Sequence, residues 1–144
     1  VKNDLNLHLE LYSKLNTLIS AKAKVLHFAE DYGQLDVLLS LQEPQRKIDS
    51  FFLDEDKRAV AKTNYIVQKR TIHYLENKEQ FENQAYEVIL ISNKNYDDWN
   101  AISQLATSTI ILVNSPSLKD AALPFGYEIK ADNKDLIVLK KKRP

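Results

Sequence analysis

The residues that could do chemistry gather at the end of a short apolar run. Val25–Phe28 is followed by a polar corner, Glu30-Asp31-Tyr32-Gly33, and a second apolar pattern begins at Leu35. In α/β folds that bind nucleotides, the backbone passes close to the ligand at such a corner, and glycines permit that approach. Here only Gly33 is a glycine, and two carboxylates precede it. The corner therefore predicts a ligand site whose backbone has lost most of its freedom.

A further carboxylate, Asp54, ends the apolar segment 47–54. A carboxylate at the carboxyl end of a parallel strand can accept hydrogen bonds from the ribose hydroxyls of a nucleotide. Asp54, Glu55 or Asp56 can instead cap the helix that follows, which is the simpler interpretation. The residues alone leave both roles open.

Several other site classes find no support in the chain. It has no cysteine, which excludes disulfides, thiolate zinc sites and a cysteine nucleophile. Its histidines, His8, His27 and His73, show no metal-ligand spacing with carboxylates. No serine lies in a nucleophile-elbow pattern, and no phosphate-binding loop occurs. The 20 basic and 20 acidic residues balance, so we expect no nucleic-acid partner.

The elements that must position these residues alternate between helix and strand. An apolar stripe predicts an amphipathic first helix over 4–21. Strands are then predicted at 24–28, 47–54, 71–75, 86–92 and 108–115, helices at 33–41, from 56 onward and at 96–106, and a hairpin at 126–140 with its turn at 131–134. Strands that alternate with helices predict a mostly parallel sheet covered on both faces, a three-layer α/β/α sandwich.

The chain is long enough for a single domain over 1–144, with an N-terminal helix at 1–22 and an α/β core at 23–144. It begins at Val1 and contains no methionine, so we expect it to be excised from a longer protein whose other domains are its partners. No apolar run approaches the roughly 18 residues that span a bilayer, and no signal-peptide pattern opens the chain. We therefore expect no membrane insertion and a cytoplasmic location, and the oligomeric state stays unknown.

Three segments, in order, resemble the class I S-adenosylmethionine-dependent methyltransferases. KVLHFAEDYGQLDVLLS (24–40) is similar to the family's first motif, FFLDEDKRAVAKTN (51–64) to its second strand and following helix, and YEVILISNKNYDDW (86–99) to its fourth strand and the turn after it. The resemblance covers 24–141 and depends on the order and spacing of the three segments. It implies a Rossmann-like, mostly parallel seven-stranded sheet that ends in an antiparallel C-terminal hairpin.

The resemblance also implies where S-adenosylmethionine would bind. The small positions of the first motif fall at Ala29, Asp31 and Gly33, the ribose position at Asp54, and the adenine position at Asn77. Asp31 is the severe departure, because its charged side chain stands where the methionine end of the cofactor would pass.

Two further departures concern charge. His27 replaces the acidic residue that commonly stands near the end of the family's first strand. After the fourth strand, Ser92 and Asn93 replace the carboxylates that would hold magnesium, so no metal is expected. Lys94 and Tyr96 can act as acid or base, although an exposed turn with a packed tyrosine is the simpler interpretation. We assign no catalytic residue.

We therefore expect a degenerate, non-catalytic methyltransferase-like domain that serves a larger protein as an interaction or regulatory module, without a cofactor. The segment 116–126 leaves little chain to enclose an acceptor, which favours this interpretation. The alternative is a divergent S-adenosylmethionine-dependent methyltransferase that acts on a small molecule. A third hypothesis is that another nucleotide binds at the same corner, with Asp54 on its ribose.

Overall fold

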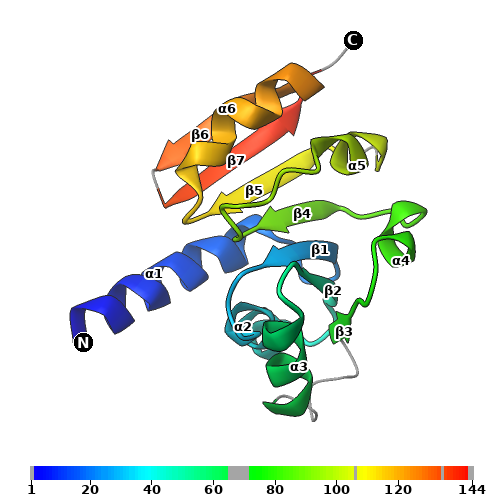
Figure 1. The fold of residues 1–144 in the computed structure, drawn as a ribbon. Coiled ribbons are helices and arrows are strands. Elements are labelled where there is room, and N and C mark those ends of the chain that lie inside the picture. The colour runs from blue at the N-terminus through cyan, green and yellow to red at the C-terminus, as the bar shows by residue number, and fades with distance from the viewer. Residues whose placement is uncertain (1, 65–71, 106, 134, 143–144) are drawn as a thin grey trace.

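A computed structural model describes residues 2–64, 72–105, 107–133 and 135–142, which form one sheet with helices packed against it (Figure 1). The helices are α1 (Lys2–Leu18), α2 (Gln34–Gln42), α3 (Glu55–Asn64), α4 (Glu79–Glu82), α5 (Trp99–Gln104) and α6 (Lys119–Ala122). The strands are β1 (Lys24–Ala29), β2 (Lys47–Phe52), β3 (Ile72–Tyr74), β4 (Val88–Ile91), β5 (Thr109–Val113), β6 (Tyr127–Asn133) and β7 (Leu136–Lys141). Two 3₁₀ turns, η2 (Pro116–Leu118) and η3 (Leu123–Phe125), flank α6.

The sheet has seven strands in the order β3-β2-β1-β4-β5-β7-β6. The first five strands of the chain pair in parallel, whereas β7 runs antiparallel to both β5 and β6. The predicted fold class, a mostly parallel seven-stranded sheet with an antiparallel C-terminal hairpin, is confirmed. The order of the strands reverses between β1 and β4, and in open α/β sheets ligands bind outside the carboxyl ends of the strands at such a switch point.

Two apolar layers cover the sheet because successive strand residues point to opposite faces. In β4, Ile89 and Ile91 pack with the core that includes α4, α5 and α6, while Val88 and Leu90 pack with α1 and α2. Both faces are buried, which explains why the central strands read as continuous apolar runs. His27 shares the parity of Val25 in β1, so it points into the layer of α1 and α2.

The structure corrects several predicted boundaries. α5 begins at Trp99 rather than at residue 96, because the Asp98 side chain accepts a hydrogen bond from Ala101 N and caps the helix. The hairpin turn predicted at 131–134 starts too early, because Ala131 and Asn133 pair within β6, which also contains a register shift after Ile129. The short α4 was not predicted. The expected continuation of the helix after Asn64 lies outside the described residues.

A fully buried arginine, Arg46, fastens the end of α1 to the body of the molecule. Its guanidinium donates to the carbonyl oxygens of Asn16 and Ile19, at 3.0 and 2.6 Å, and also to those of Ser20 and Leu39. These carbonyls lie at or near helix C-termini, where a cation is favoured. Burial nevertheless lowers the pKa of Arg46. Arg46 therefore helps to position the helix that carries one wall of the cavity described below.

Among the described residues, none of the helices combines the length and the apolar composition that a membrane crossing requires.

Candidate functional site

The five residues predicted as cofactor contacts follow the carboxyl ends of adjacent strands. Ala29 ends β1, Asp31 and Gly33 lie in the turn before α2, Asp54 follows β2, and Asn77 follows β3. Ala29 is buried, and both Asp54 and Asn77 are exposed. The sheet thus places all five along one edge, and Asp31 lines a cavity there. Their role as cofactor contacts stays a prediction.

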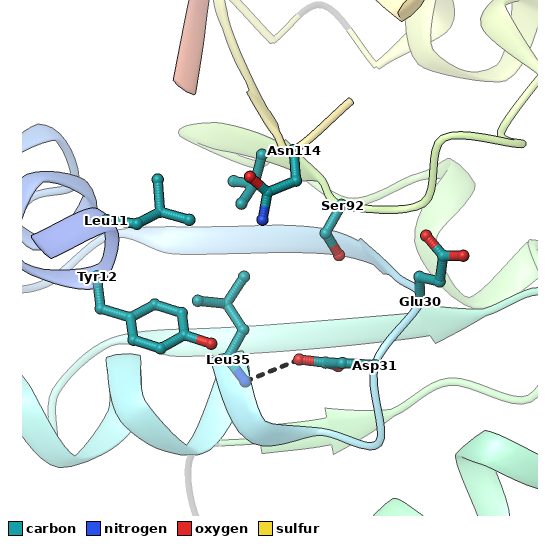
Figure 2. Close-up of a pocket in the computed structure, with 8 residues that line it drawn as sticks. Leu11, Tyr12, Glu30, Asp31, Leu35, Ser92 and Asn114 are labelled. Atoms are coloured by element: carbon teal, nitrogen blue, oxygen red, sulfur yellow. Dashed lines mark hydrogen bonds between the residues drawn. The ribbon is translucent and has the colours of Figure 1, made fainter. Parts of the chain in front are cut away.

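Asp31 turns its side chain back onto its own corner. Its carboxylate accepts hydrogen bonds from the backbone N–H groups of Gly33 and Leu35, both at 3.0 Å (Figure 2 marks the bond to Leu35). Gly33 has φ +97°, a left-handed conformation that disfavours any residue with a Cβ. The one glycine that the corner retains is therefore required by its backbone, and the amides at the start of α2 already have an acceptor.

Asp54 makes the same kind of contact at the next corner. Its Oδ1 accepts from the N–H groups of Asp56 and Lys57, at 2.9 and 3.3 Å, at the start of α3. The capping interpretation is therefore observed, whereas the ribose role stays a prediction. Asn77 N donates to the Gln80 side chain at 3.2 Å.

Three side chains, from β1, from α2 and from the turn after β4, form one hydrogen-bonded network at the switch point. His27 Nδ1 lies 2.7 Å from Asp36 Oδ1 on α2, and His27 Nε2 lies 2.7 Å from Ser92 Oγ, just after β4. The side chains of His27 and Asp36 are 0% exposed. Because a carboxylate only accepts, Nδ1–H donates to Asp36, and Nε2 of neutral His27 accepts from the Ser92 hydroxyl.

Burial and charge oppose each other at His27. Burial lowers its pKa, but the charge of Asp36, the hydrogen bond to Asp36 and the charge of Asp31 raise it, and the net result is a raised pKa. Asp36 Oδ2 is buried and has no hydrogen-bond partner among the described residues. The carboxylate therefore acts chiefly on the imidazole.

A cavity of about 260 Å³ opens beside the hydrogen-bonded residues Asp36, His27 and Ser92, at the carboxyl ends of β1, β4 and β5. Its walls come from five separate segments. Figure 2 shows the side chains of Leu11, Leu35 and Asn114 directed into the same space, with Glu30 at its rim. The lining residues are Leu11, Tyr12, Glu30, Asp31, Leu35, Ser92, Val113 and Asn114. Burial raises the pKa of Tyr12, and the charge of Asp31 raises it further.

Asn114 closes the β5 side of the cavity. It has φ +51°, a left-handed conformation that asparagine tolerates better than most residues, and its N–H donates to Asp135 O at 2.8 Å. Figure 2 shows its side-chain amide directed into the cavity between Leu11 and Ser92.

Sequence reasoning had missed Asp36, Tyr12 and Asn114. Asp36 sits among apolar residues of α2 and is fully buried, and a lone acid in an apolar pattern is the one signal that could have marked it. Tyr12 lies within the apolar stripe that predicts the first helix, and nothing local distinguishes Asn114. Asp36 contacts His27, and Tyr12 and Asn114 line one cavity with Ser92, because the tertiary structure brings their segments together.

The turn after β4 behaves as the simpler interpretation expected. Lys94 is exposed, whereas Tyr96 is 4% exposed, stacks on Phe28 with ring centroids 4.2 Å apart, and donates to Asp98 O at 2.6 Å. Burial and the nearby aspartates raise the pKa of Tyr96, so it stays protonated near neutral pH. Trp99 packs in the core. Within the described part of the chain, no group of three histidine or carboxylate side chains is arranged to hold a metal ion.

We compared the chain with known protein families, curated proteins and solved structures. Neither a protein-family model nor a curated protein matches the chain. Among solved structures, a putative caffeoyl-CoA O-methyltransferase from Staphylococcus aureus superposes with a TM-score of 0.72 at 12% identity, over 91% of this chain and 82% of that one. A TehB-like SAM-dependent methyltransferase from Corynebacterium glutamicum gives a TM-score of 0.66 at 11% identity, over 92% and 87%.

A third structure, TrmK from M. capricolum, contains its natural cofactor product S-adenosyl-homocysteine and superposes with a TM-score of 0.61 at 14% identity, over 92% of this chain and 68% of that one. This chain has the class I methyltransferase-like fold. Identities this low establish the shared fold and leave the activity to be argued from the site. In this methyltransferase-like fold, the corner after β1 carries its own carboxylate on the amides that begin α2.

Proposed function

We propose that this chain is a degenerate methyltransferase-like domain that does not transfer methyl groups and that serves a larger protein as an interaction or regulatory module. The observation that carries the proposal is the contact of the Asp31 carboxylate with the N–H groups of Gly33 and Leu35. An internal carboxylate stands where an anionic group of a ligand would bind.

The electrostatics of the corner support this proposal. Backbone N–H groups at the start of a helix attract anions, which is how α/β folds hold phosphates and carboxylates. Here Asp31 uses two of these N–H groups, and Glu30 lines the same cavity. A ligand carboxylate would have to displace a cap that contributes about 1–2 kcal/mol, and it would meet two like charges.

The dimensions support the same proposal. The cavity of about 260 Å³ lies below the roughly 300–1,000 Å³ of ordinary ligand pockets. The space toward α3 is crossed by Lys57, whose ammonium lies 5.6 Å from the centroid of the Tyr32 ring. An adenosyl group at Asp54 would have to share that space with both side chains.

The same edge of the sheet exposes two apolar side chains, Tyr32 at 47% and Leu53 at 48%. Both follow parallel strands that pair with each other, so a partner domain could cover them together. If they do contact the rest of the parent protein, the double variant Tyr32→Ser with Leu53→Ser should no longer co-elute with it in size-exclusion chromatography. Unchanged co-elution would remove these residues from the interface.

Calorimetry tests the cofactor part of the proposal. S-adenosylmethionine and S-adenosylhomocysteine are titrated into the wild-type chain, into Asp31→Gly and into Asp56→Gly, a control that removes an exposed carboxylate from the neighbouring corner. We expect no micromolar binding to the wild type or to the control. Micromolar binding to the wild type would overturn the proposal, and a gain confined to Asp31→Gly would show that this carboxylate alone closes the corner.

A second candidate, a divergent S-adenosylmethionine-dependent methyltransferase acting on a small molecule, is favoured by one observation. Glu30 and Asp31 both line the cavity and could attract the ammonium and sulfonium centres of the cofactor. If this candidate holds, S-adenosylmethionine binds the wild type, and Asp54→Ala abolishes that binding by removing the ribose contact.

A further inference from the structure

The hydrogen-bonded chain Asp36–His27–Ser92 has no part in the proposed function. A buried carboxylate orients an imidazole at 2.7 Å, and the same imidazole lies 2.7 Å from a serine hydroxyl. Nucleophilic serine sites require this arrangement of an orienting group, a base and a hydroxyl within hydrogen-bond reach. Such sites are defined by geometry rather than by position in the chain, so a separation of nine residues between His27 and Asp36 is no obstacle.

The three hydrogen-bonded side chains differ in how far they are exposed to the cavity. The side chains of His27 and Asp36 are 0% exposed, whereas Ser92 is partly exposed and lines the cavity, so a ligand in the cavity meets the serine hydroxyl first and the imidazole directly behind it. A structural histidine–aspartate pair does not require a hydroxyl at the mouth of a cavity. Ser92 Oγ also lies 3.4 Å from Phe28 O, a contact longer than its bond to the imidazole.

We propose that Ser92 is a nucleophile activated by His27 and that the cavity beside it binds and cleaves small esters that carry a positive charge. This activity goes beyond the proposed function, because it uses the hydroxyl after β4 and not the amides of the β1 corner.

The lining of the cavity defines the substrate class. Leu11, Leu35 and Val113 supply apolar walls, and Glu30 and Asp31 supply negative charge. Carboxylates favour a cation and repel an anion, and a cavity of about 260 Å³ admits a short acyl group with a compact ammonium group. Long-chain and anionic esters are disfavoured by the same features.

The reaction follows from the positions of the atoms. Ser92 Oγ attacks the carbonyl carbon of the ester while His27 Nε2 takes the hydroxyl proton, and Asp36 holds the resulting imidazolium. The tetrahedral intermediate collapses as His27 returns the proton to the leaving alcohol, which leaves an acyl group on Ser92. Water then attacks this ester, again through His27, and releases the carboxylic acid and the free serine.

Asn114 supplies a donor for the negative oxygen of the intermediate. Its side-chain amide points into the cavity that Ser92 also lines (Figure 2). A preorganised side-chain amide in such a position typically contributes about 10²–10³-fold to the rate. Asn114 is thus a specific target for variation, away from the buried pair.

Labelling of the wild-type chain tests the nucleophile without any variant. The protein is incubated with diisopropyl fluorophosphate, digested with trypsin and examined by mass spectrometry. The peptide 79–94 contains Ser92 as its sole serine. We expect stoichiometric modification at Ser92 and none at Ser20, an exposed serine that donates to Glu87 at 2.9 Å. Absence of modification at Ser92, or equal modification of Ser20, overturns the proposal.

Substitutions then separate the roles. With p-nitrophenyl acetate as substrate, Ser92→Ala should lose all hydrolysis above the blank, and His27→Asn should lose at least about 100-fold, as expected for removal of a general base. Asn114→Ala should lose about 10²–10³-fold. Ser20→Ala serves as the matched control and should keep the wild-type rate. Hydrolysis that survives in Ser92→Ala overturns the proposal, even if His27→Asn fails to fold.

Asp36 is a positioning residue, so its role is tested with the pH dependence of the labelling rate, which a loss of stability alone would not shift. The charges that act on His27 are those of Asp36 on α2 and Asp31 in the corner, and the other titratable groups of the cavity beside Ser92 are Glu30 and Tyr12. Because the base must be neutral, the labelling rate of the wild type should rise with pH through the raised pKa of His27. In Asp36→Asn the midpoint should move to lower pH, and in Asp31→Asn it should move less. An unchanged midpoint in Asp36→Asn overturns the assigned role of the pair.

The substrate class has its own comparison. Acetylcholine and its uncharged carbon isostere, 3,3-dimethylbutyl acetate, are hydrolysed side by side by the wild type and by Glu30→Gln. The wild type should prefer the cationic ester at least about tenfold in kcat/KM, and Glu30→Gln should narrow that preference. Equal rates overturn the charge assignment. Because none of these measurements uses S-adenosylmethionine, their outcome is independent of the calorimetric test of the proposed function.

Discussion

The corners after β1 and β2 use the same local device in different surroundings. In each, an aspartate just beyond the strand accepts two backbone N–H groups at the start of the next helix: Asp31 for α2 and Asp54 for α3. Asp31 is half-buried, lines a cavity and raises the pKa of His27, whereas Asp54 is exposed. The comparison teaches that a capping contact is set locally, while its electrostatic consequences depend on what the sheet places beside it.

The position of each strand in the sheet explains the difference. β1 lies between β2 and β4, so residues beyond its end face Ser92 and the cavity at the switch point. β2 lies between β1 and the three-residue β3, and its corner opens to solvent. A carboxylate next to a buried imidazole interacts through a lower effective dielectric than one in water. The predictions below therefore scale with burial.

The largest effect on stability is expected from the buried pair of Asp36 and His27. Asp36→Ala should lower the free energy of unfolding by about 3 kcal/mol, at the lower end of the cost of breaking a buried ion pair, since His27 can lose its proton. Urea unfolding monitored by circular dichroism measures it. Asp36→Asn, which keeps the shape of the side chain, should lose less. A loss below about 1 kcal/mol for Asp36→Ala would show that the pair contributes no more than a surface contact.

The second-largest effect on stability is expected from the half-buried cap, Asp31. Asp31→Ala should cost about 1–2 kcal/mol, because it leaves the N–H groups of Gly33 and Leu35 without their acceptor at a helix start that is partly removed from water. Asp31→Asn, which keeps one carbonyl acceptor, should recover part of this loss in the same urea titration. If both variants match the wild type, the cap has no energetic role.

The exposed cap is expected to contribute less. Asp54→Ala should cost about 0.5–1 kcal/mol, because water can replace the acceptor for Asp56 N and Lys57 N. If Asp54→Ala lowers the free energy of unfolding more than Asp31→Ala does in parallel experiments, burial does not explain the difference between the two corners.

The smallest signal should be the pH dependence due to His27, because burial and the two aspartates shift its pKa in opposite directions. The pKa is raised in the folded state, so the stabilisation is complete below the unfolded value near 6.5 and is lost as pH rises through the folded value. The free energy of unfolding of the wild type should fall across that window, and less so in Asp36→Asn. Parallel curves for the two proteins would assign the dependence to other groups.

The sequence predicted much of the fold because the fold depends on repeated local signals. Apolar runs such as Tyr86–Ser92 mark strands buried on both faces, and the alternation of strands with helices indicates a parallel sheet. The errors fell where single residues decide a boundary. Asp98 caps α5 and delays its start, and β6 continues through residues that were expected to form a turn.

The candidate site was predictable only along one corner. The departure at Asp31 was visible as a charged residue in place of a small one, but its contact with Gly33 N and Leu35 N was not, because the side chain could equally have pointed outward. The hydrogen bond between His27 and Ser92 connects β1 to the end of β4, and the two residues are 65 positions apart in the sequence. No pattern of period 2 or 3.6 carries information over that separation.

By itself, the sequence determined the alternation of helices and strands, the terminal hairpin and the loss of glycines at the first corner, because propensity, apolar periodicity and side-chain size act over a few residues. Only the tertiary structure decided that Asp31 closes its own corner and that Asp36, His27 and Ser92 meet beside a cavity. These contacts depend on strand order and burial, which arise when the whole sheet assembles.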